Sequence, residues 1–577
     1  MAGETIELEH MLSSDHVATE IADRWREWSN LREQKVEEWK ELRNYLYATD
    51  TRTTKNAMLP WSNSTTTPKL TQIMDNLHAN YFATLFPQRK WFRFEASTSE
   101  DNVKRKRDTI QGYLENKVNQ SDFVNTASDL LYDYITYGNC FATVTWEENY
   151  TYLEEQGLTP NYIGPKVVRI SPFDICFNPT ASAFEKTPKI IRSIKTLGEI
   201  KRMADTDENI EKAFGKLMRG RAAVRGSDAT FAKSDGYIAD GFTSIQQYYE
   251  SDYVEILTFY GDIYDRDEDK YHTSRVITVF DRAYVVSNEP EESWLGRSAI
   301  FHSGWRHRPD NLYAMGPLDN LVGMQYRIDH LENMKADVWD QIAYPVRRIR
   351  GEVDDFEWYP GCEIYVGDDG DVDYLVPDAT AMNAETQIER LMFYMEEMAG
   401  APKQAMGFRT PGEKTAFEVS SLENAANRIF NHKTAHFERV FLEPILNAML
   451  EVGRRNLVTS DEIFIEDTDN LNFFETITKE DLSGKGKIIP FGARSFAEKS
   501  TRIQNLSNLI QLKVTDPSIG VHISGKQIAK MLAEELGERE LFSENVIINE
   551  TAETASAQEE AEVNMEERRA VAEERGI

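Results

Sequence analysis

The stretch Leu318–Ala343 (LDNLVGMQYRIDHLENMKADVWDQIA) decides how the rest of the chain is interpreted. Its apolar residues lie alternately three and four positions apart when Lys335 is counted in the series. That spacing is typical of a heptad seam, along which a helix packs against neighbouring helices at a shallow angle. Pro345 ends the stretch, so the sequence predicts one helix, about 39 Å long at 1.5 Å per residue. The seam residues are Leu321, Met324, Ile328, Leu331, Val338 and Ile342.

After this helix the sequence predicts a small β unit and a return helix. Three short strands are expected at Tyr344–Arg350, Cys362–Val366 and Val372–Val376, where β-branched and aromatic residues lie between Gly, Pro and Asp. The acidic Gly367–Asp373 is expected to be the turn between two of these strands. A helix is predicted from about 381 to 399, with apolar residues on one face.

A Gly/Pro-rich break and a second long helix follow. Gly400–Gly412 contains three glycines and two prolines, which keep a helix from forming across it. Its surroundings are locally cationic, because only Glu413 offsets the three basic residues there. A helix is predicted from Lys414 to Arg455, kinked at Pro444. Its predicted buried side comprises Leu422, Ala426, Ile429, Phe437, Val440 and Ile445.

The remaining sequence predicts an α+β fold that is mainly helical, with short antiparallel strands. Helical spacing of apolar residues predicts a helix or helix pair over 14–48, and a second helix begins at Lys69 and ends before Pro87. Residues 201–245 are charged and punctuated by Gly and Ser, as in an insertion. Strands are predicted at Phe141–Trp146, Val167–Ile170, Val254–Tyr260, Val276–Phe280, Ile463–Ile465 and Lys487–Ile489.

Composition excludes several classes of protein. Lys+Arg 65 against Asp+Glu 97 gives a net charge of −32, which argues against a chain that adheres to nucleic acid over its whole surface. The net charge is compatible with two alternatives: an acidic protein that does not interact with DNA, or a protein whose acidic surface lets DNA pass without binding to it. No apolar run approaches the ~20 residues that cross a bilayer, and no secretion signal is expected at Met1. The three scattered cysteines fit a reducing cytoplasm.

Motifs that would indicate an enzyme are incomplete. Gly520–Gln527 fits Gly-x4-Gly-Lys but ends in Gln527, where a phosphate-binding loop needs Ser or Thr to hold Mg²⁺. His432 and His436 have the i,i+4 spacing of metal ligands, but Lys433 stands where a metalloprotease has its catalytic Glu. Gly367–Asp373 resembles a calcium loop without the bidentate Glu. We therefore expect no catalysis, no cofactor and no bound metal.

The succession of helix, small β unit, helix, Gly/Pro loop and long helix resembles that of tailed-bacteriophage portal proteins, the head-to-tail connectors. It is most similar to the portals of short-tailed phages. Tyr313–Asp319 and Gln325 resemble the start of the family's first stem helix, although Asp329 stands where portals often have Asn. Further similarity lies in Leu85–Pro87, Tyr137–Ala142 and Pro172–Pro179, which resemble wing segments.

The resemblance implies a division of the chain into the parts of a portal subunit. These are an N-terminal wing (1–312), a first stem helix (313–343), a clip (344–380), a second stem helix (381–399), a tunnel loop (400–413), a wing part with the long helix and strands (414–490), and a C-terminal crown or barrel region with an acidic tail (491–577). The tail, from about Glu550, is expected to be an exposed helix or disordered.

The family's function then follows as an expectation. Portals assemble as rings, usually of twelve subunits, at one capsid vertex, where DNA is packaged and later ejected through the central channel. The implied partners are further copies of the chain, the large terminase subunit, a tail adaptor, the major capsid and scaffolding proteins, and double-stranded DNA passing without sequence specificity. No membrane is involved. The expected location is the virion, after synthesis in the cytoplasm of the host bacterium.

Three groups of residues are expected to carry this function. The heptad seam would join neighbouring subunits. Arg347, Arg348 and Arg350, beside Asp368 and Asp369, would dock the motor and the adaptor, unless these charges only pair across strands within one subunit. The tunnel loop would touch DNA phosphates without reading sequence, unless it is only a hinge. Its candidate contact residues are Lys403, Met406, Phe408, Arg409 and Lys414.

Two other interpretations remain open. The chain could be another virion structural protein, such as a head–tail adaptor or a capsid subunit, although a shell subunit has no evident need for this succession of segments. It could also be an ATP-driven DNA translocase, which would require a complete phosphate-binding loop and an acidic strand end.

Overall fold

The computed structural model describes most of the chain up to residue 492. The chain divides into two compact units, Met1–Ala493 and Arg494–Ile577, and the helices and strands named here belong to the first. The residues described are 15–47, 63–87, 91–97, 104–153, 157–205, 207–224, 252–265, 269–291, 298–351, 365, 367–368, 370–375, 384–399, 428–457, 461–466, 472–492 and 506.

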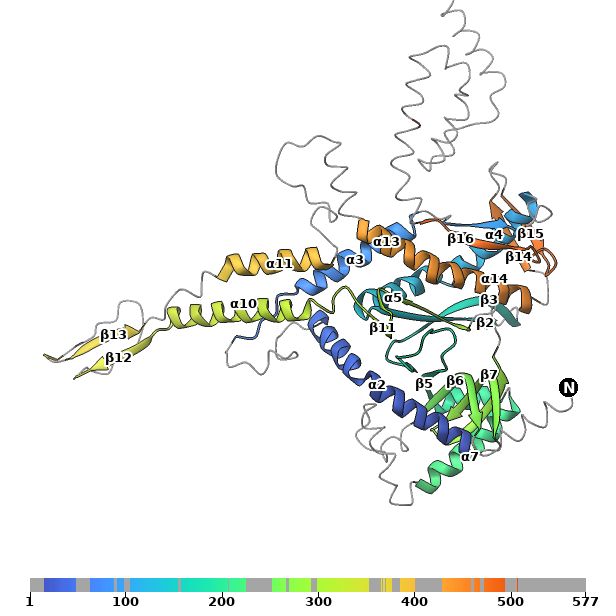
Figure 1. Cartoon of the computed structure of the whole chain (residues 1–577), viewed down its shortest axis with the longest axis horizontal. Helices are drawn as coiled ribbons and strands as arrows, with labels where there is room; N and C mark the ends of the chain where they lie inside the picture. The colour runs from blue at the N-terminus through green and yellow to red at the C-terminus, as the bar shows by residue number, and fades with distance from the viewer. Residues whose placement is uncertain are drawn as a thin grey trace, which may run out of the picture. The chain divides into compact units, whose positions relative to one another are not determined.

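Helices and antiparallel strands share these residues, so the fold is mixed helix and strand, as the α+β prediction requires (Figure 1). The helices are α2 (Asp15–Tyr47), α3 (Lys69–Leu85), α4 (Lys104–Gln120), α5 (Phe123–Thr136), α6 (Leu197–Ala204), α7 (Glu208–Val224), α10 (Val322–Ala343), α11 (Glu385–Ala399), α13 (Arg428–Phe437) and α14 (Glu443–Asn456), with the π-helical segment η5 (Glu438–Leu442) between the last two.

The strands of the described residues form two larger sheets and four two-stranded ones. The largest sheet has the order β4-β5-β6-β7-β8 (Ile175–Phe177, Lys189–Thr196, Tyr253–Asp265, Lys270–Phe280, Tyr284–Pro290). The second has the order β3-β2-β9 (Gly157–Ile170, Asn139–Leu153, Ile300–Gly304). The two-stranded pairs are β1–β16 (Phe92–Ala96, Gly486–Pro490), β10–β11 (Arg306–Arg308, Asn311–Met315), β12–β13 (Val346–Arg350, Asp371–Leu375) and β14–β15 (Asp461–Glu466, Asn472–Ile477).

The five-stranded sheet has a hydrophobic core on each face. Alternate residues of β6 serve the two cores, because successive side chains of a strand point to opposite faces. Leu257 and Phe259 pack with Val17, Ile21 and Trp25 of α2. Val254 and Ile256 pack in a separate core with residues of the helices α6 and α7. The sheet is therefore covered on both sides.

One buried ion pair joins α7 to this sheet, and a second joins the β7–β8 turn to β6. The turn between β7 and β8 places both Asp281 and Arg282 at positive φ, which is unusual for residues other than Gly. Asp281 accepts hydrogen bonds from Arg221 of α7 at 2.8 and 3.1 Å, and Arg282 donates to Glu255 of β6 at 2.7 and 2.8 Å. All four side chains are buried.

Most predicted elements are confirmed. The helix predicted from Lys69 is α3, and the predicted helix or helix pair over 14–48 is the single helix α2. The predicted 26-residue helix begins four residues later, at Val322, because the preceding residues form a turn in which the Leu321 N–H donates to the Leu318 carbonyl. Part of the predicted insertion forms α6 and α7, and residues 225–245 lie outside the described residues.

The long helix departs from an uninterrupted α-helix before Pro444. The Glu443 N–H donates to the Glu438 carbonyl, five residues back, so η5 is one π-helical turn. Such a turn adds one residue to the helix and accommodates the proline that follows, which has no N–H to donate. Val440, predicted on the buried side, is only partly buried and lines a pocket, whereas its neighbours Phe441 and Leu442 are buried.

The other predictions for this helix have mixed outcomes. Phe437 and Ile445 are buried, as expected. Residues 414–427 and the side chain of Ile429 lie outside what the structure describes. Within the described part of the chain, no helix has the length and apolar character that a membrane crossing requires.

Candidate functional site

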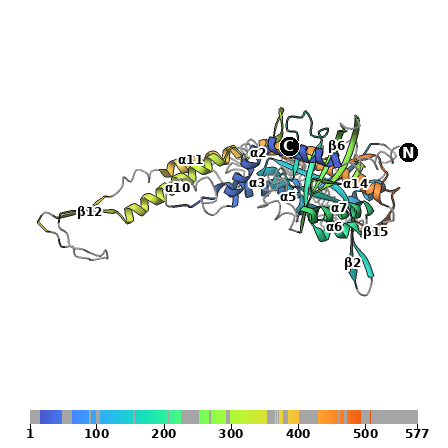
Figure 2. The ribbon, with the colours of Figure 1, turned by 90° about the horizontal axis from the view of Figure 1, so that it is seen from below.

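The helices α10 and α11, here called the helix pair, lie side by side in two views at right angles (Figures 1 and 2). Ile388 and Met395 of α11 and Ile328 of α10 are buried in one hydrophobic core. Lys335 of α10 forms an ion pair with Glu385, and this hydrogen bond raises the pKa of Lys335. The pairing of two helices predicted to be antiparallel stem helices is thus supported by both apolar and charged contacts.

The predicted seam is divided between covered and accessible residues. Leu321, Ile328 and Leu331 are buried within the chain's own core, and Met324 packs against that core. Val338 and Ile342, nearer the end of α10, are only partly buried. Leu321, Ile328 and Leu331 therefore have no surface to offer to a second subunit, and the oligomerisation role of the seam stays a prediction for its last part.

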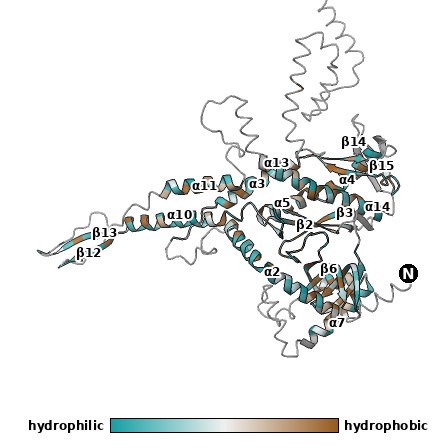
Figure 3. Cartoon of the chain, viewed as in Figure 1, coloured by the Kyte–Doolittle hydropathy of each residue, from teal (hydrophilic) through white to brown (hydrophobic). Residues whose placement is uncertain are grey.

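A set of exposed apolar side chains, here called the second apolar face, lies on the outside of the helix pair. Phe393, Tyr394 and Met398 of α11 are 52%, 50% and 47% exposed, although Met395 beside them is fully buried. On α10, Trp339 is 55% exposed. Hydrophobic residues alternate with hydrophilic ones along both helices in Figure 3. A helix that is apolar on more than one side is normally covered on each of them.

A row of polar side chains on α10, here called the polar ladder, holds the extended segment Asn63–Thr67. Its members Gln325, Asp329, Asn333 and Asp337 lie four residues apart and hence on one face of the helix. The first three are at most 1% exposed. Such a stripe of amides and carboxylates is the signal that could have revealed the ladder, but nothing in the pattern identifies its partner.

Each member of the ladder binds backbone groups of the segment. Gln325 Nε2 donates to the Thr67 carbonyl at 2.5 Å, and Asp329 Oδ1 accepts from the Thr67 N–H at 3.0 Å. Asn333 and Thr65 exchange two hydrogen bonds of 2.9 Å. Asp337 accepts from the Asn63 N–H at 2.9 Å. The helix side chains thus satisfy the backbone of a segment that belongs to no sheet of the described residues.

The residue Lys69, just after this segment, makes a second link to the helix pair. Lys69, at the start of α3, forms a buried ion pair of 2.5 Å with Glu396 of α11. Asn63, at the other end of the segment, also donates from its side chain to Asp337 and Asp340 at 2.6 and 2.9 Å. The chain from Asn63 to Lys69 therefore contacts both helices of the pair.

The two-stranded ribbon β12–β13 follows α10 directly and corresponds to the predicted clip. Its strands pair antiparallel, with Arg348 opposite Asp373 and Arg350 opposite Asp371. The register places the arginines beside the acidic strand of the same chain, which is what simple cross-strand pairing within a subunit predicts. All five residues of β12 are exposed, with Val346 66% exposed.

The neighbouring clip residues are only partly described. The Gly370 N–H donates to the Gly367 carbonyl at 2.9 Å, so the expected turn is present and carries Asp368 at the surface. Asp369 and most of Cys362–Val366 lie outside the described residues. Docking of partners on Arg347, Arg348, Arg350, Asp368 and Asp369 stays a prediction.

The tunnel loop and the incomplete phosphate-binding motif lie outside the described residues, including Lys403, Met406, Phe408, Arg409 and Lys414. Across the part of the chain that is described, no three His, Cys, Asp or Glu side chains converge as metal ligands would. Cys140 and Cys176 are buried and form no disulfide within the described part of the chain, and burial raises the pKa of Cys140.

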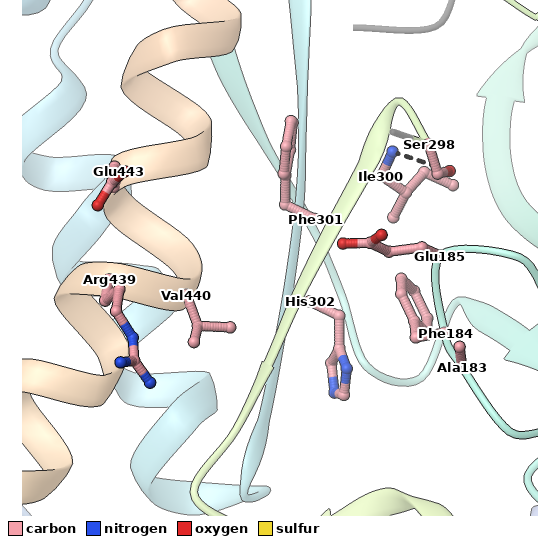
Figure 4. A pocket seen from close by; sticks show the side chains of 10 residues that line it. All are labelled: Ala183, Phe184, Glu185, Ser298, Ile300, Phe301, His302, Arg439, Val440 and Glu443. Carbon is pink, nitrogen blue, oxygen red and sulfur yellow. Dashed lines mark hydrogen bonds between the residues drawn. The ribbon is translucent and has the colours of Figure 1, made fainter. Parts of the chain in front are cut away.

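A pocket of about 480 Å³ lies between β9, the loop at Ala183–Glu185 and the helical turn that contains Arg439 and Glu443 (Figure 4). His302 lines it, and its ring nitrogen Nε2 lies 3.0 Å from Asn139 Oδ1. Burial lowers the pKa of His302 to about 3, and the charges of His307 and Lys189 act in the same direction. The lining thus combines a neutral histidine with both acidic and basic side chains.

A known protein family matches the N-terminal part of the chain. Residues 18–152, from α2 into β2, match the family model described as bacteriophage head to tail connecting protein. The match covers less than a quarter of the chain and does not reach the helix pair. No curated protein matches the chain. The family match supports a role for this chain as a bacteriophage head-to-tail connector, a component of the virion.

Proposed function

We propose that the chain is the subunit of a phage portal of the short-tailed type, a ring at one capsid vertex through which double-stranded DNA is packaged and ejected. The ring would have twelve subunits, as the resemblance implies. The chain would have no catalytic role; the large terminase subunit and the tail adaptor would dock in turn on the ribbon β12–β13. The family match to connecting proteins supports the connector part of this proposal.

The observation that carries the proposal is the second apolar face of the helix pair. Covering an exposed half of Phe393, Tyr394 or Met398 would contribute roughly 1 kcal/mol per side chain and subunit contact. In a closed ring every subunit contributes this face to one neighbour, so the gain is repeated around the ring. Identical copies would cover the exposed part of these side chains.

The ribbon offers further support. A two-stranded sheet is marginally stable alone in water, and Ile349 and Leu375 are 53% and 50% exposed on it. Contact with a docking partner or a neighbouring subunit would cover these apolar residues. The paired charges Arg348–Asp373 and Arg350–Asp371 would then give the docking face its specificity rather than most of its affinity.

The test is whether the chain forms rings through the helix pair. Native mass spectrometry and negative-stain images should show closed rings with a central hole for the wild type. The double variant Phe393→Ser/Met398→Ser should be recovered mainly as smaller species. The matched control, Met203→Ser/Met218→Ser, removes two methionines of similar exposure from α6 and α7 and should still form rings.

Two outcomes would contradict the proposal. A wild-type chain that stays monomeric over a range of salt would exclude a self-assembling ring. Rings that form equally well from the Phe393→Ser/Met398→Ser variant would show that the helix pair is not the subunit contact.

A further inference from the structure

A compact group of basic side chains, here called the basic patch, stands out in a chain with a net charge of −32. Three members are consecutive residues of β10, all of them exposed. The other three lie on α13 and η5 at positions 433, 436 and 439, within two helical turns of one another. The patch comprises Arg306, His307, Arg308, Lys433, His436 and Arg439.

The ring of Trp305 brings the two halves of the patch together. The Lys433 ammonium lies 4.7 Å from the centre of the ring, and the Arg306 guanidinium lies 5.2 Å from it. Lys433 also donates to the Trp305 carbonyl, and Trp305 Nε1 lies 3.1 Å from the hydroxyl of the buried Tyr81. Since β9, which precedes Trp305, packs against η5, the side chains are held by the fold rather than by chance proximity.

Among the described residues, the patch has no paired counter-charge. None of its six side chains forms an ion pair with a carboxylate of the described residues, whereas Arg169, Arg192 and Arg221 each do. Burial lowers the pKa of His436, and the charged groups that lower it further are Lys433, Arg439, His432 and His307, all of them basic. Nearby carboxylates are Asp310 at the β10–β11 turn and Glu185 and Glu443, which line the pocket with Arg439.

We propose that the basic patch binds phosphates of the backbone of double-stranded DNA. An acidic protein repels DNA over most of its surface, so contact is confined to places where cations collect. Arginine guanidinium groups match phosphate oxygens in geometry and keep their charge. The Glu185 and Glu443 carboxylates make the adjoining pocket unsuitable for an anion, so the phosphates would lie on the exposed side of β10.

The choice of DNA over an acidic protein rests on the proposed function. β10 and β11 immediately precede α10, and α13 follows the predicted tunnel loop at 400–413. The patch is therefore built from the described elements that precede and follow the helix pair in the sequence, and in the proposed ring the helix pair surrounds the DNA. It would be a contact for the passing duplex in addition to the tunnel loop.

The test measures binding of a fluorescent 30-base-pair duplex to the full chain by anisotropy over a range of salt. The variant Arg306→Ala/Arg308→Ala/Arg439→Ala removes three exposed cations and keeps Lys433, which packs on Trp305. This variant should bind the duplex at least about tenfold more weakly near physiological salt. The slope of log affinity against log salt concentration should also become shallower, by about 0.9 for each phosphate that is no longer neutralised. The control Arg26→Ala/Lys201→Ala/Lys212→Ala removes three exposed cations elsewhere and should bind like the wild type.

Each outcome decides the inference. Equal affinity and salt slope in the patch variant and the wild type would overturn it, as would an equally large weakening in the control. Polyglutamate that binds at the patch while the duplex does not would show a site for an acidic protein instead. Ring formation, imaged in the same preparations, tests the proposed function separately: patch-dependent DNA binding without rings would support the patch and contradict the portal.

Discussion

The polar ladder makes a quantitative prediction about one residue, Asn333. It exchanges two 2.9 Å hydrogen bonds with the backbone of Thr65, and its side chain is 1% exposed. Each such bond contributes about 0.5–1.5 kcal/mol net, and Leu in this position fills a similar volume without making either bond. We therefore expect Asn333→Leu to weaken the attachment of Asn63–Thr67 to α10 by about 1–3 kcal/mol.

Hydrogen exchange is the suitable assay, because it reports local opening of a segment even when the rest of the chain stays folded. Peptides that cover 63–70 should exchange about 5- to 150-fold faster in Asn333→Leu than in the wild type. Peptides from the five-stranded sheet should be unchanged. The control is Asn125→Leu, which removes only an exposed contact to Asp122 at the start of α5.

Exchange of 63–70 within twofold of the wild type would refute the reasoning. It would mean that the segment is held by its apolar neighbours or by the Lys69–Glu396 ion pair. Accelerated exchange throughout the chain would instead show that Asn333 supports the whole core rather than this segment.

Other parts of the fold respond to mutation and pH in ways that can be measured. Asp281→Ala leaves the buried Arg221 without its carboxylate and should lower the free energy of unfolding by about 3–5 kcal/mol, measured by urea titration. The control Arg26→Ala breaks an exposed ion pair and should lower it by roughly 0.5 kcal/mol or less. Because the pKa of His302 is lowered to about 3 in the folded chain, the unfolded chain binds the proton first as pH falls. The free energy of unfolding should therefore fall as pH drops from about 6.5 towards 3, by at most about 1.4 kcal/mol per pH unit. Unfolding of His302→Gln measured over this range should lack that contribution. Replacing residues 402–411 by a short Gly bridge should leave rings intact but reduce the DNA content of virions; fully retained genomes would show that the loop is only a hinge.

Proline residues at helix ends explain which elements can be predicted from the sequence. Pro68 and Pro87 flank α3, and Pro345 follows the end of α10, so both ends of α3 and the last residue of α10 can be predicted closely. The sequence does not predict the strand β15 (Asn472–Ile477), although it predicts its pairing partner β14. Polar residues in β15 leave no alternation that separates a strand from a loop.

The candidate sites depend on contacts that no local pattern specifies. Asn333 and Thr65 are 268 residues apart, and Arg306 and Lys433 meet only because both lie against Trp305. The seam on α10 correctly indicates helix packing, but spacing alone cannot tell that Leu321 and Ile328 face the chain's own core. Periodicity identifies the apolar face of a helix; which surface covers it is decided by the tertiary fold.

The π-helical turn η5 sets the rotational phase between the two ends of the long helix. Phe437, Phe441, Ile445 and Met449 are all buried at intervals of four residues, and in a pure α-helix each interval would advance the face by about 40°. The π-helical turn has more residues per turn, so it reduces this rotation of the buried face. Deleting one residue within Glu438–Leu442 would therefore shorten the chain little, yet it would turn the basic side chains of α13 by about 100° relative to the buried side of α14. A single extra residue in this helix thus fixes the direction in which the patch faces.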